Sequence, residues 1–250
     1  MSGATVSPSE LAPFLIVGLG LFAGAVVSGL MGFAFSAVAG AILLHVLPPL
    51  EAVPLMMACS TVTQAVSLFA LRDTMMWRGS SALIAGGALG MLPALYLLCH
   101  VDARLFRIGF GVFLVGYAAL MLRRPAVACA RDVPGRLGDA IIGFGGGLVG
   151  GLTAMPGALP VIWCTFRGMP KHQQRGVVQP YIAAMQLLAL ALLLSHNGVS
   201  REALLNLTLG LPALAAGATL GVVLFRRIDD AWFRRVVLAV LLFAGLLLVA

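Results

Sequence analysis

The sequence predicts an all-α integral membrane protein made of two inverted repeats, each with about five segments of which the second is a short half-helix. Three observations support this fold class. Hydrophobic residues make up 61% of the 250 residues and charged residues only 10%, whereas soluble domains average about 25% charged residues. Apolar stretches are long enough to cross a bilayer, and selected residues recur in both halves at one spacing. The mean hydropathy of +1.05 fits one compact membrane domain.

Several stretches reach the roughly 20 apolar residues that a transmembrane helix needs. They are 11–30, 51–71, 80–99, 104–122, 176–196, 203–225 and 230–250, with a slightly short, glycine-rich stretch at 138–155. Two further stretches, 33–47 and 157–167, rise only about 22 Å and about 16 Å. Because the hydrocarbon core is about 30 Å thick, we expect each to be the second limb of a hairpin. Residues 1–10 contain no Lys or Arg, so we interpret the first stretch as a retained helix rather than a signal peptide.

An internal repeat relates the two halves. Three matched pairs share an offset of 122 (151−29, 170−48 and 186−64): Gly29 with Gly151, Pro48 with Pro170, and Gln64 with Gln186. Apolar residues match easily by chance, so the proline and glutamine pairs are the informative ones. The chain therefore divides into a first membrane repeat (1–122), a basic cytoplasmic linker (123–137) and a second membrane repeat (138–250).

The basic residues predict the orientation. The net charge is +7, and Lys and Arg concentrate in short cytoplasmic loops. Five legs per half, with the N-terminus outside, place 13 of the 16 basic residues in cytoplasmic loops at 72–79, 123–137, 167–175 and 226–235. Four crossings per half would export six or seven of them. We therefore expect oppositely directed halves in a bacterial inner membrane, with both termini outside.

The sequence lacks the common motifs of redox, metal-binding and nucleotide-binding sites. It contains no CxxC pair, metal-ligand cluster, phosphate-binding loop or dinucleotide fingerprint. We expect no enzymatic activity, no cofactor, no metal and no nucleic-acid partner, since loop topology accounts for the positive charge. Without ATPase motifs, active transport would draw on a gradient. His45, His172 and His196 leave coupling to a proton or another ion open.

The tips of the two hairpins are the first candidate substrate site. Short segments at matching positions of inverted repeats point to a transport site, and the N-terminal end of a helix suits an anion. The tip residues are Ser28, Gly29, Gly32 and Phe33 in the first half, and Thr153, Met155, Pro156 and Gly157 in the second. Glycine can instead serve close helix packing. We favour packing for residues 145–147 and leave both roles open at the tips.

Glutamines near the middle of two helices are the second candidate. Gln64 and Gln186 are equivalent in the repeat, with Ser60 one turn before the first and Gln179 two turns before the second. A buried amide needs a hydrogen-bonding partner. These side chains could line the substrate pathway or join helices to each other.

A basic cluster forms the third candidate. Arg167, Lys171, His172 and Arg175 could form a cytoplasmic vestibule that attracts anions. Loop topology explains these residues equally well.

The sequence also resembles a known family. The resemblance rests on the run from Gly24 to Gly32, on Pro48-Pro49 followed by Ala52, on the second copy from Gly145 through Gly151 to Pro170, and on Asp102 and Asp229, each four residues before a phenylalanine. This pattern is similar to the sulfite exporter TauE/SafE family of bacterial permeases. The resemblance implies transport of a small sulfur-containing anion, such as sulfite or an organosulfonate. The tips depart from the family's glycine-rich pattern, at Gly32–Ser36 and Met155–Ala158.

Together these observations favour a secondary transporter of a small anion that works in the lipid bilayer. Two other classes were weighed. An intramembrane enzyme acting on lipid would need paired acids, histidines or metal ligands at membrane depth. A non-transporting assembly partner would be expected to carry a long loop or tail for its partner.

Overall fold

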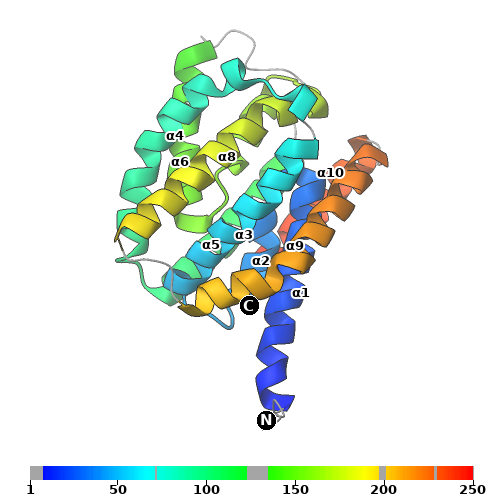
Figure 1. The fold of residues 1–250 in the computed structure, drawn as a ribbon. Coiled ribbons are helices and arrows are strands. Elements are labelled where there is room, and N and C mark those ends of the chain that lie inside the picture. The colour runs from blue at the N-terminus through cyan, green and yellow to red at the C-terminus, as the bar shows by residue number, and fades with distance from the viewer. Residues whose placement is uncertain (1–7, 71, 123–134, 197–200, 228–229, 250) are drawn as a thin grey trace.

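The computed structural model describes residues 8–70, 72–122, 135–196, 201–227 and 230–249, which form helices joined by short loops and contain no strand (Figure 1). The first half contains α1 (Pro8–Met31), α2 (Phe35–Leu43), α3 (Pro49–Ala70), the 3-10 turn η1 (Arg72–Thr74), α4 (Trp77–Leu98) and α5 (Ala103–Leu122). The second half contains α6 (Gly135–Thr153), α7 (Ala158–Phe166), α8 (Lys171–His196), α9 (Arg201–Arg227) and α10 (Asp230–Val249).

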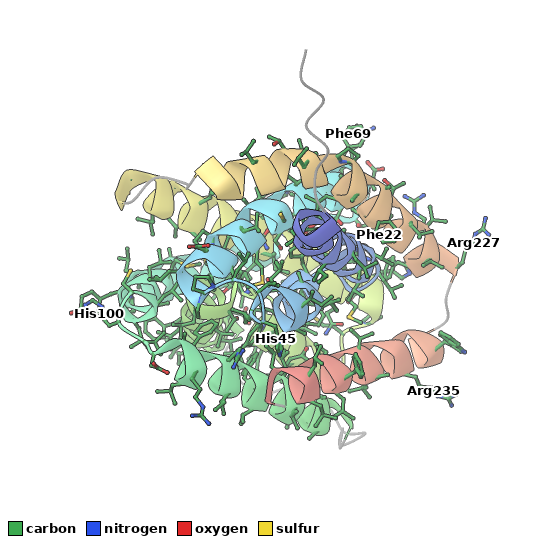
Figure 2. All side chains as sticks on the ribbon, turned by 90° about the horizontal axis from the view of Figure 1, so that it is seen from below. Phe22, His45, Phe69, His100, Arg227 and Arg235 are labelled. Atoms are coloured by element: carbon green, nitrogen blue, oxygen red, sulfur yellow. The ribbon has the colours of Figure 1, made fainter. Side chains whose placement is uncertain are left out.

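Five of the described helices are long and apolar enough to cross a membrane, namely α3, α4, α5, α8 and α9. The outer surface is apolar as well: Leu19, Leu89, Tyr96, Leu209 and Phe243 are each more than 65% exposed. Exposed apolar surface of this extent suits contact with lipid. Figure 2 shows Phe69, His100, Arg227 and Arg235 at the periphery of the bundle. The prediction of an all-α membrane protein is therefore confirmed.

Helix boundaries match the expected segments closely, with one important difference. The two short segments form nine-residue helices, α2 and α7. Helix α8 begins at Lys171, five residues before the apolar stretch predicted at 176–196. Polar residues such as His172 and Gln174 therefore form the first turns of a helix rather than a loop. Residues 123–134 of the predicted linker lie outside the described residues, and its last three residues belong to α6.

Glycines bring two pairs of helices into close contact. A methyl group placed on Gly147 of α6 would lie 2.1 Å from the carbonyl oxygen of Gly87 in α4. A methyl group on Gly221 of α9 would lie 2.1 Å from the carbonyl oxygen of Val26 in α1. Because these distances are far below van der Waals contact, any side chain would separate the backbones. Helix α4 therefore packs along α6, and α1 along α9.

Three of the loops expected to be cytoplasmic meet at one end of the bundle. The Arg226 guanidinium donates a 2.9 Å hydrogen bond to the carbonyl oxygen of Ala70. The backbone N–H of Met76 donates to the carbonyl oxygen of Gly176 at 2.9 Å. The rings of His172 and Phe225 are 5.4 Å apart. The end of α3, the starts of α4 and α8, and the end of α9 therefore share one end, which is the upper end in Figure 1.

Candidate functional site

The first helix of each half ends in the same unusual backbone conformation. Helix α1 ends at Met31, and Gly32 follows with φ +87°. Helix α6 ends at Thr153, and Ala154 follows with φ 56°. The two positions again differ by 122 residues (154−32). A left-handed residue terminates a helix and lets the chain turn back, so each half forms a tip from which its short helix starts.

The two tips contact each other inside the protein. The Ser36 hydroxyl donates a 2.7 Å hydrogen bond to the carbonyl oxygen of Ala154. A methyl group on Gly157 would lie 2.7 Å from Cβ of Phe33. Ser28, Phe33, Thr153 and Met155 are buried, and so are the other tip residues predicted from the sequence: Gly29, Gly32, Pro156 and Gly157.

The start of each short helix lies within this buried region. Ala34 precedes α2 and Gly157 precedes α7, and neither helix start carries a side-chain cap. The positive ends of both helix dipoles therefore lie near the tips. Thr153 also lines an apolar cavity of about 240 Å³ between α4, α5 and α6, together with residues such as Phe106 and Phe113.

The four residues predicted from the glutamine pattern are brought together between α3 and α8. Gln179 donates a hydrogen bond to Oε1 of Gln64, and Gln64 donates to the carbonyl oxygen of Gly32 at 2.9 Å. Deeper along the same two helices, Gln186 donates to Ser60 Oγ at 2.5 Å. All four side chains are at least 97% buried. The glutamines therefore link the two halves and contact the first tip.

One hydrogen-bond acceptor of this network has no donor among the described residues. Among the described residues, Oε1 of Gln186 is buried and has no hydrogen-bond partner. The Ser28 hydroxyl on α1 and the Thr63 hydroxyl on α3 lie 3.3 Å apart, and Thr63 also donates to the carbonyl oxygen of Ser60. A polar path thus follows the contact between α3 and α8.

Arg175 joins this network, although the sequence analysis assigned it to a loop. Its Nη2 donates to the carbonyl oxygen of Gly29 at 2.7 Å and its Nη1 to that of Leu30 at 3.2 Å. Its Nε donates to Gln179 Oε1 at 3.3 Å, and its guanidinium carbon lies 4.2 Å from the Phe225 ring centroid. Only 6% of the residue is exposed. The guanidinium thus satisfies carbonyls in the last turn of α1.

Among the side chains that the structure describes, no carboxylate forms an ion pair with Arg175. The ion pairs among the described residues are Arg72 with Asp73 and Arg167 with Asp139. The groups that contact Arg175 are carbonyl oxygens, an amide and an aromatic ring, all of them neutral. Guanidinium groups bind planar and tetrahedral oxyanions through paired N–H donors. The arrangement is chemically suited to hold an anion.

Two other members of the predicted vestibule make contacts of their own. Arg167 pairs with Asp139 at 3.2 Å, and His172 packs against Phe225. The side chain of Lys171 lies outside the described residues, as does that of His196. A helical spacing signal for Arg175 was present in the sequence, because Gln179 follows it by four residues and places both on one helix face.

The described residues contain no cluster of His, Cys, Asp or Glu that could hold a metal ion.

Residues 16–248 match the protein family described as sulfite exporter TauE/SafE. The chain belongs to the TauE/SafE sulfite exporter family. No curated protein and no solved structure matches it. The match covers nearly the whole chain, so the family resemblance seen in the sequence is confirmed. TauE/SafE membership and the apolar helices together identify a multi-pass membrane transporter.

Proposed function

We propose that this TauE/SafE protein is a secondary transporter of a small sulfur-containing anion, such as sulfite or an organosulfonate, and that the anion binds beside Arg175. The observation that carries this proposal is the buried guanidinium of Arg175, whose contacts among the described residues are all with neutral groups. Burying a charged side chain without an opposite charge beside it is strongly disfavoured, so an anion bound beside Arg175 would offset this cost.

The neighbouring polar side chains complete the proposed site. Gln179 contacts Arg175 and Gln64, and both amides can donate to oxyanion oxygens. Gln186 and Ser60 continue the polar path deeper along α3 and α8. The tip residues bring two helix N-terminal ends to the same region. We assign the anion to Arg175, Gln179 and Gln64, with Ser60 and Gln186 as the next position.

Arg175 also offers a way to couple binding to movement. Its guanidinium holds the last turn of α1 through the carbonyl oxygens of Gly29 and Leu30. An anion beside Arg175 would compete for the same N–H donors. Binding would then loosen the hold on α1 and favour movement of the first hairpin, α1 with α2. For binding to move the first hairpin, the anion needs only to bind one position of the hairpin more tightly than the other.

We further infer that the two halves are inverted copies. The helix contacts support this, because exchanging the halves converts the α1–α9 contact into α6–α4, and the α3–α9 contact into α8–α4. The end of α1 lies beside Arg175 at the start of α8. The start of α6 is on the same side, since a methyl group on Gly135 would lie 3.6 Å from Arg167. The two first helices thus run in opposite directions.

This arrangement supports a definite topology. With the arginine-rich end in the cytoplasm, both termini lie outside, in the inner membrane of a bacterium. A reporter that is active only in the cytoplasm, fused to the C-terminus, should therefore be inactive. The same reporter inserted in the loop at residue 73, at the basic end, should be active. An active C-terminal reporter contradicts the topology.

Transport itself is tested in vesicles containing the purified chain. Labelled sulfite, an organosulfonate and sulfate are offered with and without proton and sodium gradients, and initial uptake is measured. We expect saturable uptake of at least one sulfur anion, and its loss in Arg175→Gln protein that still elutes as a single species. The gradient dependence identifies any coupling ion. No uptake of any sulfur anion would reject the transporter and favour an assembly partner or a lipid enzyme.

A further inference from the structure

The proposed anion site contains one net positive charge. Arg175 is the only charged side chain that is buried among the residues whose side chains the structure describes. The other buried polar side chains are those of serine, threonine and glutamine: Ser28, Ser36, Ser60, Thr63, Gln64, Ser67, Ser80, Thr153, Gln179 and Gln186. Phe225 covers the guanidinium at 4.2 Å. The charge balance of the site is therefore set by Arg175 together with its ligand.

The charge of the ligand then decides how well the site is neutralised. A monoanion beside Arg175 forms a neutral pair. A dianion leaves one negative charge without compensation in an apolar interior, where unpaired charge is strongly disfavoured. The glutamine amides contribute hydrogen bonds but no charge, so they cannot balance a second negative charge.

We propose that the site selects its substrate by charge, and that it accepts monoanions carrying a sulfonate-like group while excluding dianions such as sulfate. This inference rests on the proposed function and narrows its substrate class. Alkanesulfonates without a second ionisable group and hydrogen sulfite each present oxygen acceptors and a single negative charge. The fork of Arg175 can donate to two such oxygens, as guanidinium groups do with planar and tetrahedral oxyanions. Gln179 Oε1 accepts from Arg175 Nε at 3.3 Å, and Gln179 Nε2, which donates one N–H to Gln64, has a second N–H for a third oxygen.

Competition in vesicles tests this selection without any mutation. The initial uptake of labelled methanesulfonate is measured against unlabelled ethanesulfonate and unlabelled sulfate. We expect ethanesulfonate to compete. Sulfate should inhibit at least about tenfold more weakly, which corresponds to a difference of about 1.4 kcal/mol in binding free energy. Sulfite uptake should fall as the pH rises through neutrality, because hydrogen sulfite becomes a dianion. Methanesulfonate keeps its single charge, and its uptake should change little over the same range.

A variant that adds a charge provides a second, independent test. Gln179→Lys places a second positive charge beside Arg175, and Gln179→Met is the uncharged control. The ratio of sulfate to methanesulfonate uptake should rise about tenfold or more in Gln179→Lys and stay low in Gln179→Met. Elution as a single species shows that each variant is folded. If Gln179→Lys does not fold, the competition experiment on the unaltered chain decides.

The outcomes separate charge selection from transport as such. Equal inhibition by sulfate and ethanesulfonate overturns the selection for monoanions and leaves anion transport standing. An unchanged uptake ratio in folded Gln179→Lys protein also overturns the selection. Absence of saturable uptake for methanesulfonate, sulfite and sulfate alike rejects the proposed function itself.

Discussion

Gly32 and Ala154 end the first helix of their respective halves with the same left-handed backbone, 122 residues apart. The two residues differ in how well they tolerate it. Glycine adopts positive φ without penalty, whereas an L-residue in this region costs about 1–2 kcal/mol. The first tip is therefore relaxed at this residue, and the second tip is held in a strained form by its surroundings, including the Ser36 hydroxyl bonded to Ala154.

Exchanging these residue types should have opposite effects at the two tips. Gly32→Ala introduces strain, and its methyl group would lie 2.8 Å from Gln179 Oε1. We expect a loss of about 2 kcal/mol or more in the free energy of unfolding and reduced transport. Ala154→Gly removes the strain and should be neutral or stabilising by about 0.5 kcal/mol. Thermal unfolding of the purified protein measures both, and destabilisation by Ala154→Gly would show that the second tip is not strained.

The contact between α4 and α6 predicts a different sensitivity to small side chains. Gly147→Ala places a methyl group 2.1 Å from the Gly87 carbonyl oxygen, so the two helices must separate. We expect a loss of about 1–3 kcal/mol, in the range seen for overpacked cores. Gly116→Ala in α5 is the matched control, because nothing lies within 4 Å of the added group. It should stabilise the helix slightly, by up to about 1 kcal/mol. Melting temperatures of the two variants should shift in opposite directions.

Hydropathy and the repeat were enough to predict the helices and the tips, but they could not predict that one of the basic residues is buried beside the first tip. The apolar stretches bound the helices because lipid requires length and low polarity. Gln64 and Gln186 stood out because an amide is rare in such a stretch. Arg175 was predicted only as one member of an exposed cytoplasmic vestibule, because it lies before the apolar part of α8 and loop topology already explained it.

The burial of Arg175 depends on a contact that no local pattern contains. Its guanidinium reaches the carbonyl oxygens of Gly29 and Leu30, 146 and 145 residues earlier in the chain. The left-handed conformation of Ala154 was equally hidden, since alanine disfavours it. Local sequence rules therefore located the elements, while the contacts between halves determined the chemistry of the site.

Asp139 joins the two helices of the second hairpin. The first hairpin has Val17 at the equivalent position and therefore lacks this carboxylate. Asp139 Oδ1 accepts hydrogen bonds from Trp163 Nε1 at 2.7 Å and from Arg167 Nη1 at 3.2 Å. These bonds join α6 to α7. Asp139→Asn removes the charge of this pair, so we expect a loss of about 1.5 kcal/mol in the free energy of unfolding.

A surface pair provides the control for Asp139. Arg72 and Asp73 are 3.8 Å apart, and their side chains are 71% and 94% exposed. Because exposed pairs contribute little, Asp73→Asn should leave the melting temperature unchanged. Equal melting temperatures for the Asp139→Asn and Asp73→Asn variants would show that the Asp139 cluster does not hold the second hairpin.

The pair formed by Gln64 and Gln179 separates a structural role from a substrate-binding role. If the two amides only join α3 to α8, a double-mutant cycle with Gln64→Met and Gln179→Met should show a coupling of about 0.6 kcal/mol in unfolding, with unchanged substrate affinity. If the pair also binds the anion, each single variant should in addition weaken substrate affinity. We expect the second result, with a loss of about tenfold for each variant, because a charge-assisted hydrogen bond contributes about 1.5–3 kcal/mol.

Gln174 is the matched control on the same helix. It donates to the carbonyl oxygen of Val161 at 2.7 Å and to Thr165 Oγ1 at 2.8 Å, so it joins α8 to α7. Gln174→Met should therefore lower the melting temperature and leave the half-saturating substrate concentration unchanged. For each variant, the loss of substrate affinity is divided by the loss of stability. A higher ratio for Gln179→Met than for Gln174→Met shows that Gln179 contributes to substrate binding beyond its effect on the stability of α8. Equal ratios would assign Gln179 to helix packing alone. Replacing a glutamine that contacts the anion must weaken binding by more than the loss of stability accounts for.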